Sequence, residues 1–339
     1  MTAEILTEMI RQLLSQAGEY VGIGWQGGEP TLMGLPFFQK AVGLMMHFGR
    51  NQRVGNSFQT NGLLINKKWA AFLKQHDFLV GLSLDGPEHI HNRYRLIRGG
   101  GGTWATVVDK AKLMLDAGVS VNALSVVTDY SADFSEEIYA FLKGTGLNFM
   151  QFIPCVEFNP QAPGTMRPYS VTPEKFGSFL CNIFDLWMKD FVNGKPTTSI
   201  RFFDSLFFRY VGFSPPECTL LERCGNYLVV EHNGDVYSCD FFVEPRWRLG
   251  NIKTDRLDRL FNSKKQRAFG AMKQKLASEC RSCQWLTYCT GGCTRHRTGT
   301  PQSLKTSYLC KAYEIFFNHA HGRMSELATA WKAANKPFN

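Results

Sequence analysis

The sequence has 339 residues, 44% of them hydrophobic, and 38 Lys and Arg against 29 Asp and Glu give a formal charge of +9. This length predicts two domains, and the hydrophobic content excludes a chain that is disordered throughout. No run approaches the ~20 apolar residues of a membrane span, no export signal opens the chain, and the basic residues are scattered, so we expect a cytoplasmic protein that binds neither membrane nor nucleic acid.

The first part of the chain alternates helical and strand patterns, as is typical of parallel βα units. It begins with a helix, since Ile5, Met9 and Leu13 belong to one apolar face. Strands are expected at 20–25, 54–58, 78–84, 119–127 and 148–153, and further helices at 35–48, 104–117 and 176–191. A chain that enters such a series on a helix is expected to lack the first strand of a parallel barrel.

The pattern changes near residue 197. The stretch LVVEHNGDVYSCDFF alternates apolar and polar residues about Asn233 and Gly234, which predicts a hairpin with a two-residue turn. A helix is expected after it at about 255–276. The sequence therefore predicts a boundary between 1–197 and 198–325.

The ten cysteines are concentrated in the last part of the chain, and none precedes Cys155. Without an export signal, such a set is more typical of a metal or redox centre than of disulfides. Eight of them follow the spacing C-x5-C-x9-G-x4-C and then C-x2-C-x5-C-x3-C-x16-C, at Cys218, Cys224, Cys239, Cys280, Cys283, Cys289, Cys293 and Cys310. Two sets of four thiolates suit either zinc or 4Fe-4S clusters, and the spacing alone leaves both open.

Each expected strand is followed by a polar or glycine-rich segment, and in a parallel barrel such segments form the rim that carries the active site. The first of these segments consists of Gln26, Gly27, Gly28, Glu29 and Pro30. A tight glycine turn followed by a carboxylate can present carbonyls and a negative charge to an ammonium group. On these residues alone, an ordinary turn that opens a helix is the simpler interpretation.

The cysteine spacing resembles the SPASM domain of radical S-adenosylmethionine (SAM) enzymes that modify peptides, which carries two auxiliary 4Fe-4S clusters. The segments QGGEPTL, QTNG, LVGLSLDGPEHIHNRYR and CDFFV are similar to the anaerobic sulfatase-maturating enzymes in particular. The resemblance implies an α/β fold, with a partial parallel (β/α)6 radical SAM barrel at 1–197 and a SPASM domain with a C-terminal helix at 198–325. It implies one cluster on Cys218, Cys224, Cys239 and Cys293, and another on Cys280, Cys283, Cys289 and Cys310.

The same resemblance implies a SAM site on the rim. The motif from Gln26 to Pro30 would bind the amino group of SAM, and Ser83 and Arg95 would contact its ribose and its carboxylate. An arginine suits a carboxylate because of its forked donors, although a solvated loop charge is the default for a single arginine. The adenine would lie near Val156, and the rim would also include Thr60, Asn61 and Asp85.

Asp240 follows a cysteine of the set directly, and the resemblance implies that it is the general base of the reaction. In that family a radical formed from SAM removes a hydrogen from a Cys or Ser side chain of a sulfatase polypeptide, which becomes Cα-formylglycine. Asp240 would take a proton and the auxiliary clusters an electron, with flavodoxin or ferredoxin as electron donor. On the residues alone, Asp240 is a solvated aspartate at the end of a strand.

One motif of these enzymes is missing from the sequence. Radical SAM enzymes hold their catalytic cluster with CxxxCxxC after the first barrel strand, and the first cysteine of this chain is Cys155. We therefore expect a chain that starts after this strand, exposes a strand edge at 20–25 and does not by itself cleave SAM reductively. The alternatives are a radical SAM maturase of another peptide, and a non-catalytic iron-sulfur or zinc protein that binds peptides or transfers electrons.

Overall fold

The computed structural model describes residues 1–162, 164–297 and 306–335. The chain forms two compact units, each assembled from three stretches. The first unit comprises Met1–Leu82, Lys110–Val121 and Arg223–Gln274, and the second comprises Ser83–Asp109, Asn122–Glu222 and Lys275–Asn339. None of the helices in the described part combines the length and the apolar character that a membrane span requires.

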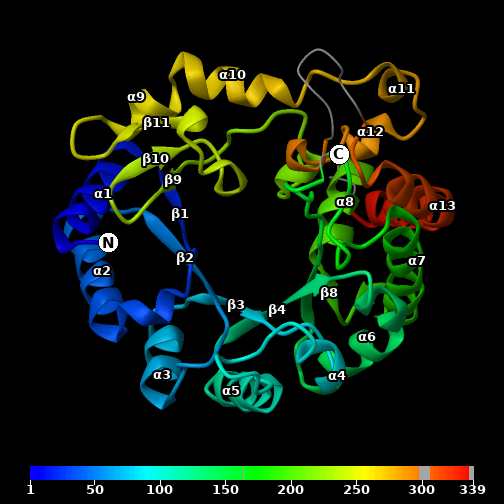
Figure 1. The fold of residues 1–339 in the computed structure, drawn as a ribbon, viewed down its shortest axis with the longest axis horizontal. Helices are drawn as coiled ribbons and strands as arrows, with labels where there is room; N and C mark the ends of the chain where they lie inside the picture. The colour runs from blue at the N-terminus through cyan, green and yellow to red at the C-terminus, as the bar shows by residue number, and fades with distance from the viewer. Residues whose placement is uncertain (163, 298–305, 336–339) are drawn as a thin grey trace. The chain divides into compact units, whose positions relative to one another are not determined.

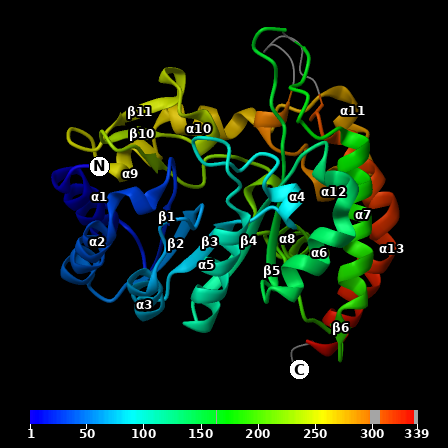
Figure 2. The same ribbon diagram turned by 60° about the horizontal axis from the view of Figure 1, so that its bottom comes forward.

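Parallel strands form the centre of the first unit, in the order β1 (Tyr20–Trp25), β2 (Arg53–Thr60) and β3 (Leu79–Ser83). The helices α1 (Ala3–Gln16), α2 (Leu35–Phe48) and α3 (Lys67–Gln75) lie along the outside of these strands (Figures 1 and 2). Within the described residues β2 is the one strand that pairs with β1, so the predicted strand edge at 20–25 is confirmed.

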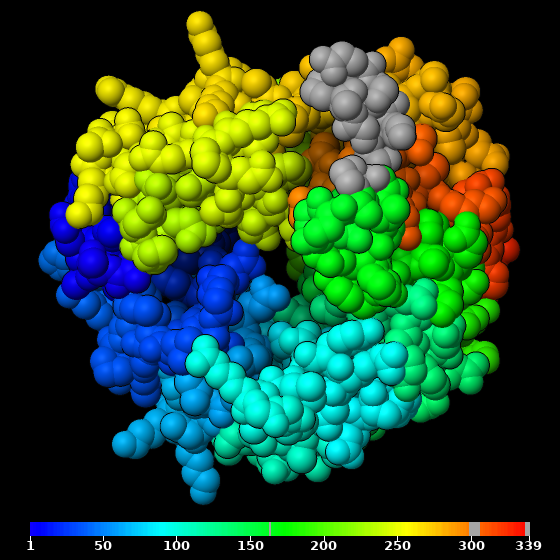
Figure 3. Space-filling model, in the orientation of Figure 1, coloured from blue at the N-terminus to red at the C-terminus, as the bar shows by residue number. Residues whose placement is uncertain are grey.

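Helix α1 begins at a threonine cap, since the hydroxyl of Thr2 accepts a hydrogen bond from the backbone N–H of Ile5 at 3.3 Å. The helix buries one apolar face. The apolar face also carries Gln12, a buried polar side chain. Its amide donates to the carbonyl of Ile252 at 3.0 Å and its oxygen accepts from the backbone of Leu257 at 2.8 Å. These bonds hold α1 against the later stretch of the same unit, which lies beside the blue N-terminal helix as yellow atoms in Figure 3.

An antiparallel sheet in the order β11-β10-β9 completes the first unit, with β9 at Val229–Val230, β10 at Asp235–Tyr237 and β11 at Arg248–Asn251. The predicted hairpin is present, but its loop has three residues instead of two. The backbone N–H of Glu231 donates to Asp235 at 2.8 Å, and Gly234 adopts a φ of 88°. A turn followed by a left-handed glycine is the usual form of a three-residue loop.

The helix predicted at 255–276 is interrupted. The structure has α9 (Leu257–Phe261) and α10 (Lys264–Met272) instead of one continuous helix. Ser263 lies between them, and its hydroxyl accepts a hydrogen bond from the backbone of Gln266 at 3.1 Å. A serine in this position starts a new helix because it satisfies an amide that has no partner within the helix.

The second unit also contains parallel strands, in the order β4 (Ser120–Val127), β5 (Phe149–Pro154) and β8 (Ser199–Ile200). A short antiparallel pair joins β6 (Phe191–Val192) to β7 (Lys195–Pro196). The helices are α4 (Glu88–His91), α5 (Trp104–Asp116), α6 (Ser135–Gly144), α7 (Pro173–Lys189), α8 (Arg201–Val211), α11 (Ser278–Arg281), α12 (Leu286–Cys289) and α13 (Cys310–Ala334). The first residues of β4 and the last of α5 belong to the stretch 110–121 of the first unit.

The core of the second unit lies between α7, α8 and α13. Phe184, Phe203 and Phe316 contact one another, with ring centroids 5.4 to 5.8 Å apart. Helices α7 and α13 run side by side in Figures 1 and 2 and meet at Gly177. A Cβ atom at Gly177 would lie 3.0 Å from Ile315 and 3.1 Å from the backbone of Ala312, so this crossing requires glycine.

The alternation of parallel strands and helices confirms the predicted α/β class. It also confirms the five strands expected in the first part of the chain, to within a few residues at each end. The closure of the strands into a (β/α)6 barrel and the boundary at residue 197 stay predictions.

Candidate functional site

Glu29 links two of the predicted rim segments in the first unit. One oxygen of its carboxylate accepts hydrogen bonds from the backbone and the hydroxyl of Thr31, at 3.0 and 2.6 Å, and from the hydroxyl of Thr60 at 2.7 Å. The other accepts from the backbone N–H of Asn61 at 2.8 Å. The carboxylate therefore holds the loop after β1 against the loop after β2. This internal use was not anticipated from the sequence, which suggested that the carboxylate faces a ligand.

The glycines of the same motif adopt the conformation that the sequence predicts. Gly27 and Gly28 have φ values of 88° and 51°, in the left-handed region that side chains rarely adopt. Pro30 follows as the first residue of a short 3-10 helix. Both glycines are exposed, and a Cβ atom at either position would have no neighbour within 4 Å, so the backbone of this turn is open to a ligand.

Gln26 and Asp240 meet in the first unit although 214 positions separate them. The amide nitrogen of Gln26 donates to one oxygen of the Asp240 carboxylate at 3.3 Å. The hydroxyl of Tyr227 donates to the other oxygen at 2.6 Å and lies 3.2 Å from the sulfur of Cys239. The structure thus brings together the predicted cofactor motif, the predicted base and a predicted cluster ligand.

Tyr227 was not singled out in the sequence, because it belongs to none of the spaced motifs. Burial and its hydrogen bond to Asp240 hold the pKa of the Tyr227 hydroxyl far above its ordinary value. The group is therefore a proton donor in its hydrogen bonds at neutral pH. Burial also raises the pKa of Cys239 to about 12, and the nearby Asp240 contributes to the rise. A cation bound to this sulfur would reverse that effect.

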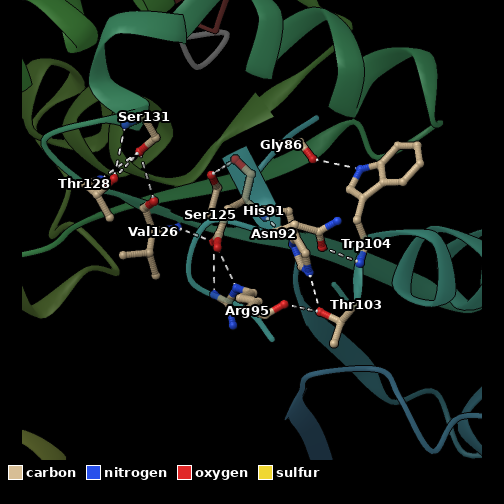
Figure 4. A network of polar contacts seen from close by, with 11 residues as sticks. Gly86, His91, Asn92, Arg95, Thr103, Trp104, Ser125, Val126, Thr128 and Ser131 are labelled. Carbon is tan, nitrogen blue, oxygen red and sulfur yellow. Dashed lines mark hydrogen bonds and ion pairs between the residues drawn. The ribbon is translucent and has the colours of Figure 1, made fainter. Parts of the chain in front are cut away.

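Asp85 and Arg95 form an ion pair in the second unit (Figure 4). Nε and NH2 of Arg95 donate to the two carboxylate oxygens of Asp85 at 2.5 and 3.0 Å, and the backbone of Val126 donates to the same carboxylate at 2.9 Å. Asp85 is buried, whereas the side chain of Arg95 is 26% exposed. The arginine is therefore fixed on one edge, and among the described residues its other N–H groups have no hydrogen-bond acceptor.

The remaining predicted SAM contacts belong to the second unit, whose first residue is Ser83. Ser83 ends β3 and is half-buried, and Val156 follows β5 and is buried. Cys155 lies before Val156, and burial raises the pKa of its thiol to about 11. Burial also raises the pKa of Cys181 to about 11, so both cysteines outside the spaced set are shielded thiols.

The predicted second cluster quartet lies entirely within the second unit, at Cys280, Cys283, Cys289 and Cys310. Burial raises the pKa of Cys289 to about 11, and Cys310, Cys280 and Cys283 contribute to the rise because they are close enough to interact with it. Burial also raises the pKa of Cys280 and of Cys310, and the nearby Cys283 contributes to both rises. A cationic centre at these cysteines would favour their thiolates instead. The donor set therefore fits the predicted cluster.

Within the described residues no group of three or more His, Cys, Asp or Glu is arranged around a single ion. The ligands of a four-iron cluster stand farther apart than those of one ion, because each binds a different iron. The other quartet is divided between the units, with Cys224 and Cys239 in the first and Cys218 and Cys293 in the second. Its assembly into one site stays a prediction.

Comparison with known proteins agrees with these features. Residues 1–142 match the family model of the radical SAM superfamily, and residues 218–284 match that of SPASM, an iron-sulfur cluster-binding domain. The cysteine-type anaerobic sulfatase-maturating enzyme of Clostridium perfringens is 39% identical, over 97% of this chain and 89% of the relative. The serine-type enzyme of Bacteroides thetaiotaomicron is 36% identical, over 94% of this chain and 80% of the relative.

Solved structures show the same relationship. The structure of native anSMEcpe with bound AdoMet and Cp18Cys peptide has a TM-score of 0.93 and 39% identity, and the match covers 98% of this chain and 92% of that one. Streptococcus suis SuiB bound to S-adenosylmethionine shares the fold alone, with a TM-score of 0.58, 15% identity, and coverage of 87% and 66%. The chain therefore belongs to the anaerobic sulfatase-maturating enzyme family of radical SAM proteins with a SPASM domain.

Proposed function

We propose that the protein oxidises a Cys or Ser side chain of a sulfatase polypeptide to Cα-formylglycine. The observation that carries this proposal is the contact of Asp240 with Gln26 and Tyr227, beside the sulfur of Cys239. A carboxylate held next to a cofactor motif and a predicted cluster ligand is well placed to take a proton during an oxidation. The similarity to both cysteine-type and serine-type enzymes supports the reaction and leaves the substrate residue open.

The cofactors would supply the redox chemistry when bound: SAM the radical that removes a hydrogen atom from the substrate β-carbon, and the auxiliary clusters an acceptor for one electron. The chain's own residues would bind and orient SAM and the substrate. The turn at Gly27 and Gly28 offers carbonyls to the amino group of SAM, and Arg95 offers N–H groups to its carboxylate. Asp240 takes the proton of the substrate thiol or hydroxyl. With a cysteine substrate, water then replaces the sulfur, which leaves as hydrogen sulfide.

The test uses a chain extended at its N-terminus by a segment with CxxxCxxC, because the 339-residue sequence does not contain this motif. The extended protein, reconstituted with iron and sulfide without oxygen, is supplied with SAM, a reductant such as reduced flavodoxin, and sulfatase peptides with Cys or Ser at the target position. Formation of 5′-deoxyadenosine together with a formylglycine peptide, seen by mass spectrometry, would support the proposal. An extended protein that carries its clusters and still fails to cleave SAM would refute it.

A further inference from the structure

Arg95 and three other residues, Asp85, His91 and Thr103, form a closed ring of hydrogen bonds in the second unit (Figure 4). The backbone N–H of Asp85 donates to Nδ1 of His91 at 3.4 Å, and Nε2 of His91 lies 3.0 Å from the hydroxyl of Thr103. That hydroxyl donates to the backbone carbonyl of Arg95 at 2.8 Å. The guanidinium of Arg95 closes the ring on the carboxylate of Asp85.

The direction of every hydrogen bond in this ring is fixed. The backbone N–H of Asp85 can only donate, so Nδ1 of His91 accepts and its Nε2 carries the proton. The hydroxyl of Thr103 gives its one proton to the carbonyl of Arg95 and therefore accepts from His91. Burial lowers the pKa of His91 to about 4, which is consistent with this neutral form. No member can rotate without breaking two bonds.

The ring is anchored to β4 and shielded from water. The hydroxyl of Ser125 donates to the backbone carbonyl of Asp85 at 2.9 Å, and the backbone of Val126 donates to its carboxylate. His91, Thr103 and Asp85 are buried, and their exposed fractions are 0%, 6% and 6%. Because buried polar networks of this kind are rigid when fully satisfied, the ring fixes both the backbone and the guanidinium of Arg95.

The fixed guanidinium has a free edge. Two of its five N–H groups point to Asp85. The other three, on Nη1 and Nη2, make no hydrogen bond within the described part of the chain and are left for another acceptor. A planar edge with parallel N–H groups matches a carboxylate, and holding it in place in advance avoids the entropy cost of ordering a long side chain. Charge alone does not explain the site, since Asp85 already neutralises Arg95.

We propose that His91 and Thr103 are positioning residues that hold Arg95 for the carboxylate of SAM. The proposal rests on the proposed function, from which the contact between Arg95 and SAM is taken. It adds that the affinity for the amino acid part of SAM depends on two buried residues that touch no ligand.

The test compares Thr103→Val with Thr103→Ser in the 339-residue chain, purified without oxygen and reconstituted with iron and sulfide. Valine keeps the shape of threonine without the hydroxyl, whereas serine keeps the hydroxyl. Dissociation constants are measured by calorimetry for SAM and for 5′-methylthioadenosine, which has the adenosine but no amino acid part. Thr103→Val is expected to raise the dissociation constant for SAM about fivefold, which corresponds to one lost neutral hydrogen bond. The dissociation constant for 5′-methylthioadenosine should stay unchanged. Thr103→Ser is expected to change neither.

Three results would overturn the inference. The first is that Thr103→Val binds SAM as tightly as the unsubstituted chain. The second is that Thr103→Val binds SAM and 5′-methylthioadenosine more weakly by the same factor. The third is that Thr103→Ser binds SAM as weakly as Thr103→Val does. Equal weakening would mean that Thr103 supports the fold without positioning Arg95. Arg95→Ala separates the inference from the proposed function. If that variant binds SAM as tightly as the unsubstituted chain, the proposed SAM contact itself is wrong.

Discussion

Replacing Glu29 tests whether its carboxylate holds two loops together or faces the ligand. It accepts four hydrogen bonds, two of them from the backbone N–H groups of Thr31 and Asn61. The threonine hydroxyls can turn to other partners, but these backbone donors cannot. A hydrogen bond to a charged acceptor contributes about 1.5 to 3 kcal/mol, and the lower end applies to a half-buried group. Glu29→Ala is therefore expected to lower the free energy of unfolding by about 3 kcal/mol.

Glu29→Gln should lower the free energy of unfolding by about half as much, because the amide keeps one acceptor oxygen and has an NH2 donor in place of the other. The assay is urea unfolding followed by circular dichroism on the unsubstituted chain and both variants, with SAM affinity measured in parallel. Glu19→Gln is the matched control, since Glu19 is exposed and its carboxylate makes no hydrogen bond with the described residues. If Glu29→Gln leaves the unfolding midpoint unchanged and abolishes SAM binding, the carboxylate acts on the ligand and our reasoning is wrong.

Three further predictions concern the clusters, acid stability and the base. Cys283→Ala should remove about four of about eight irons per chain, whereas Cys181→Ala should retain them, as measured by iron and sulfide analysis. Burial lowers the pKa of His91 from its ordinary 6.5 to about 4, so its contribution to stability is complete above about pH 6.5 and falls toward pH 4. Urea unfolding should show about 2 kcal/mol lost between pH 7.5 and 5 that His91→Gln does not lose. In the extended chain, Tyr227→Phe should still form 5′-deoxyadenosine but yield severalfold less formylglycine per molecule of it, because Asp240 loses its hydroxyl partner at 2.6 Å.

Each of these predictions has an outcome that contradicts it. Full iron in Cys283→Ala would remove that residue from the ligand set, and two zinc ions in place of iron would make the cysteines structural. Equal acid sensitivity in His91→Gln would show that His91 is not the titrating group. Tyr237→Phe is the control for Tyr227→Phe, because its hydroxyl makes no hydrogen bond within the described residues. The same product ratio in both variants would show that Asp240 does not need Tyr227.

Much of the fold could be predicted because it depends on local periodicity. The strand at 20–25 and the helix at 35–48 were placed at the residues where the structure has them. The helix break at Ser263 and the three-residue loop at Gly234 were missed, since each depends on single hydrogen bonds and not on a pattern. Gln12 was missed for a related reason. A glutamine on an apolar helix face has no visible partner until the chain folds back over 240 residues.

The candidate site was predicted in its residue types but not in its connections. The motif from Gln26 to Glu29 was recognised as a unit, yet its side chains bind other residues of the chain. Gln26 donates to Asp240, and Glu29 accepts from Thr60 and Asn61. Spacing identifies which residues belong together in a family. It contains no information on which polar groups satisfy one another in the folded chain, because those contacts join distant segments.

The close contact at Gly177 makes metal content a measure of helix packing. Helix α13 begins at Cys310, the last predicted ligand of the second quartet, and α7 holds that helix where Gly177 meets Ala312 and Ile315. Any side chain at Gly177 would push α13 outward and carry the sulfur of Cys310 with it. If this quartet holds a cluster as predicted, a substitution that touches no sulfur would therefore release its iron. A loss of cluster in a variant of this protein thus points to a cysteine or to the helix that carries one.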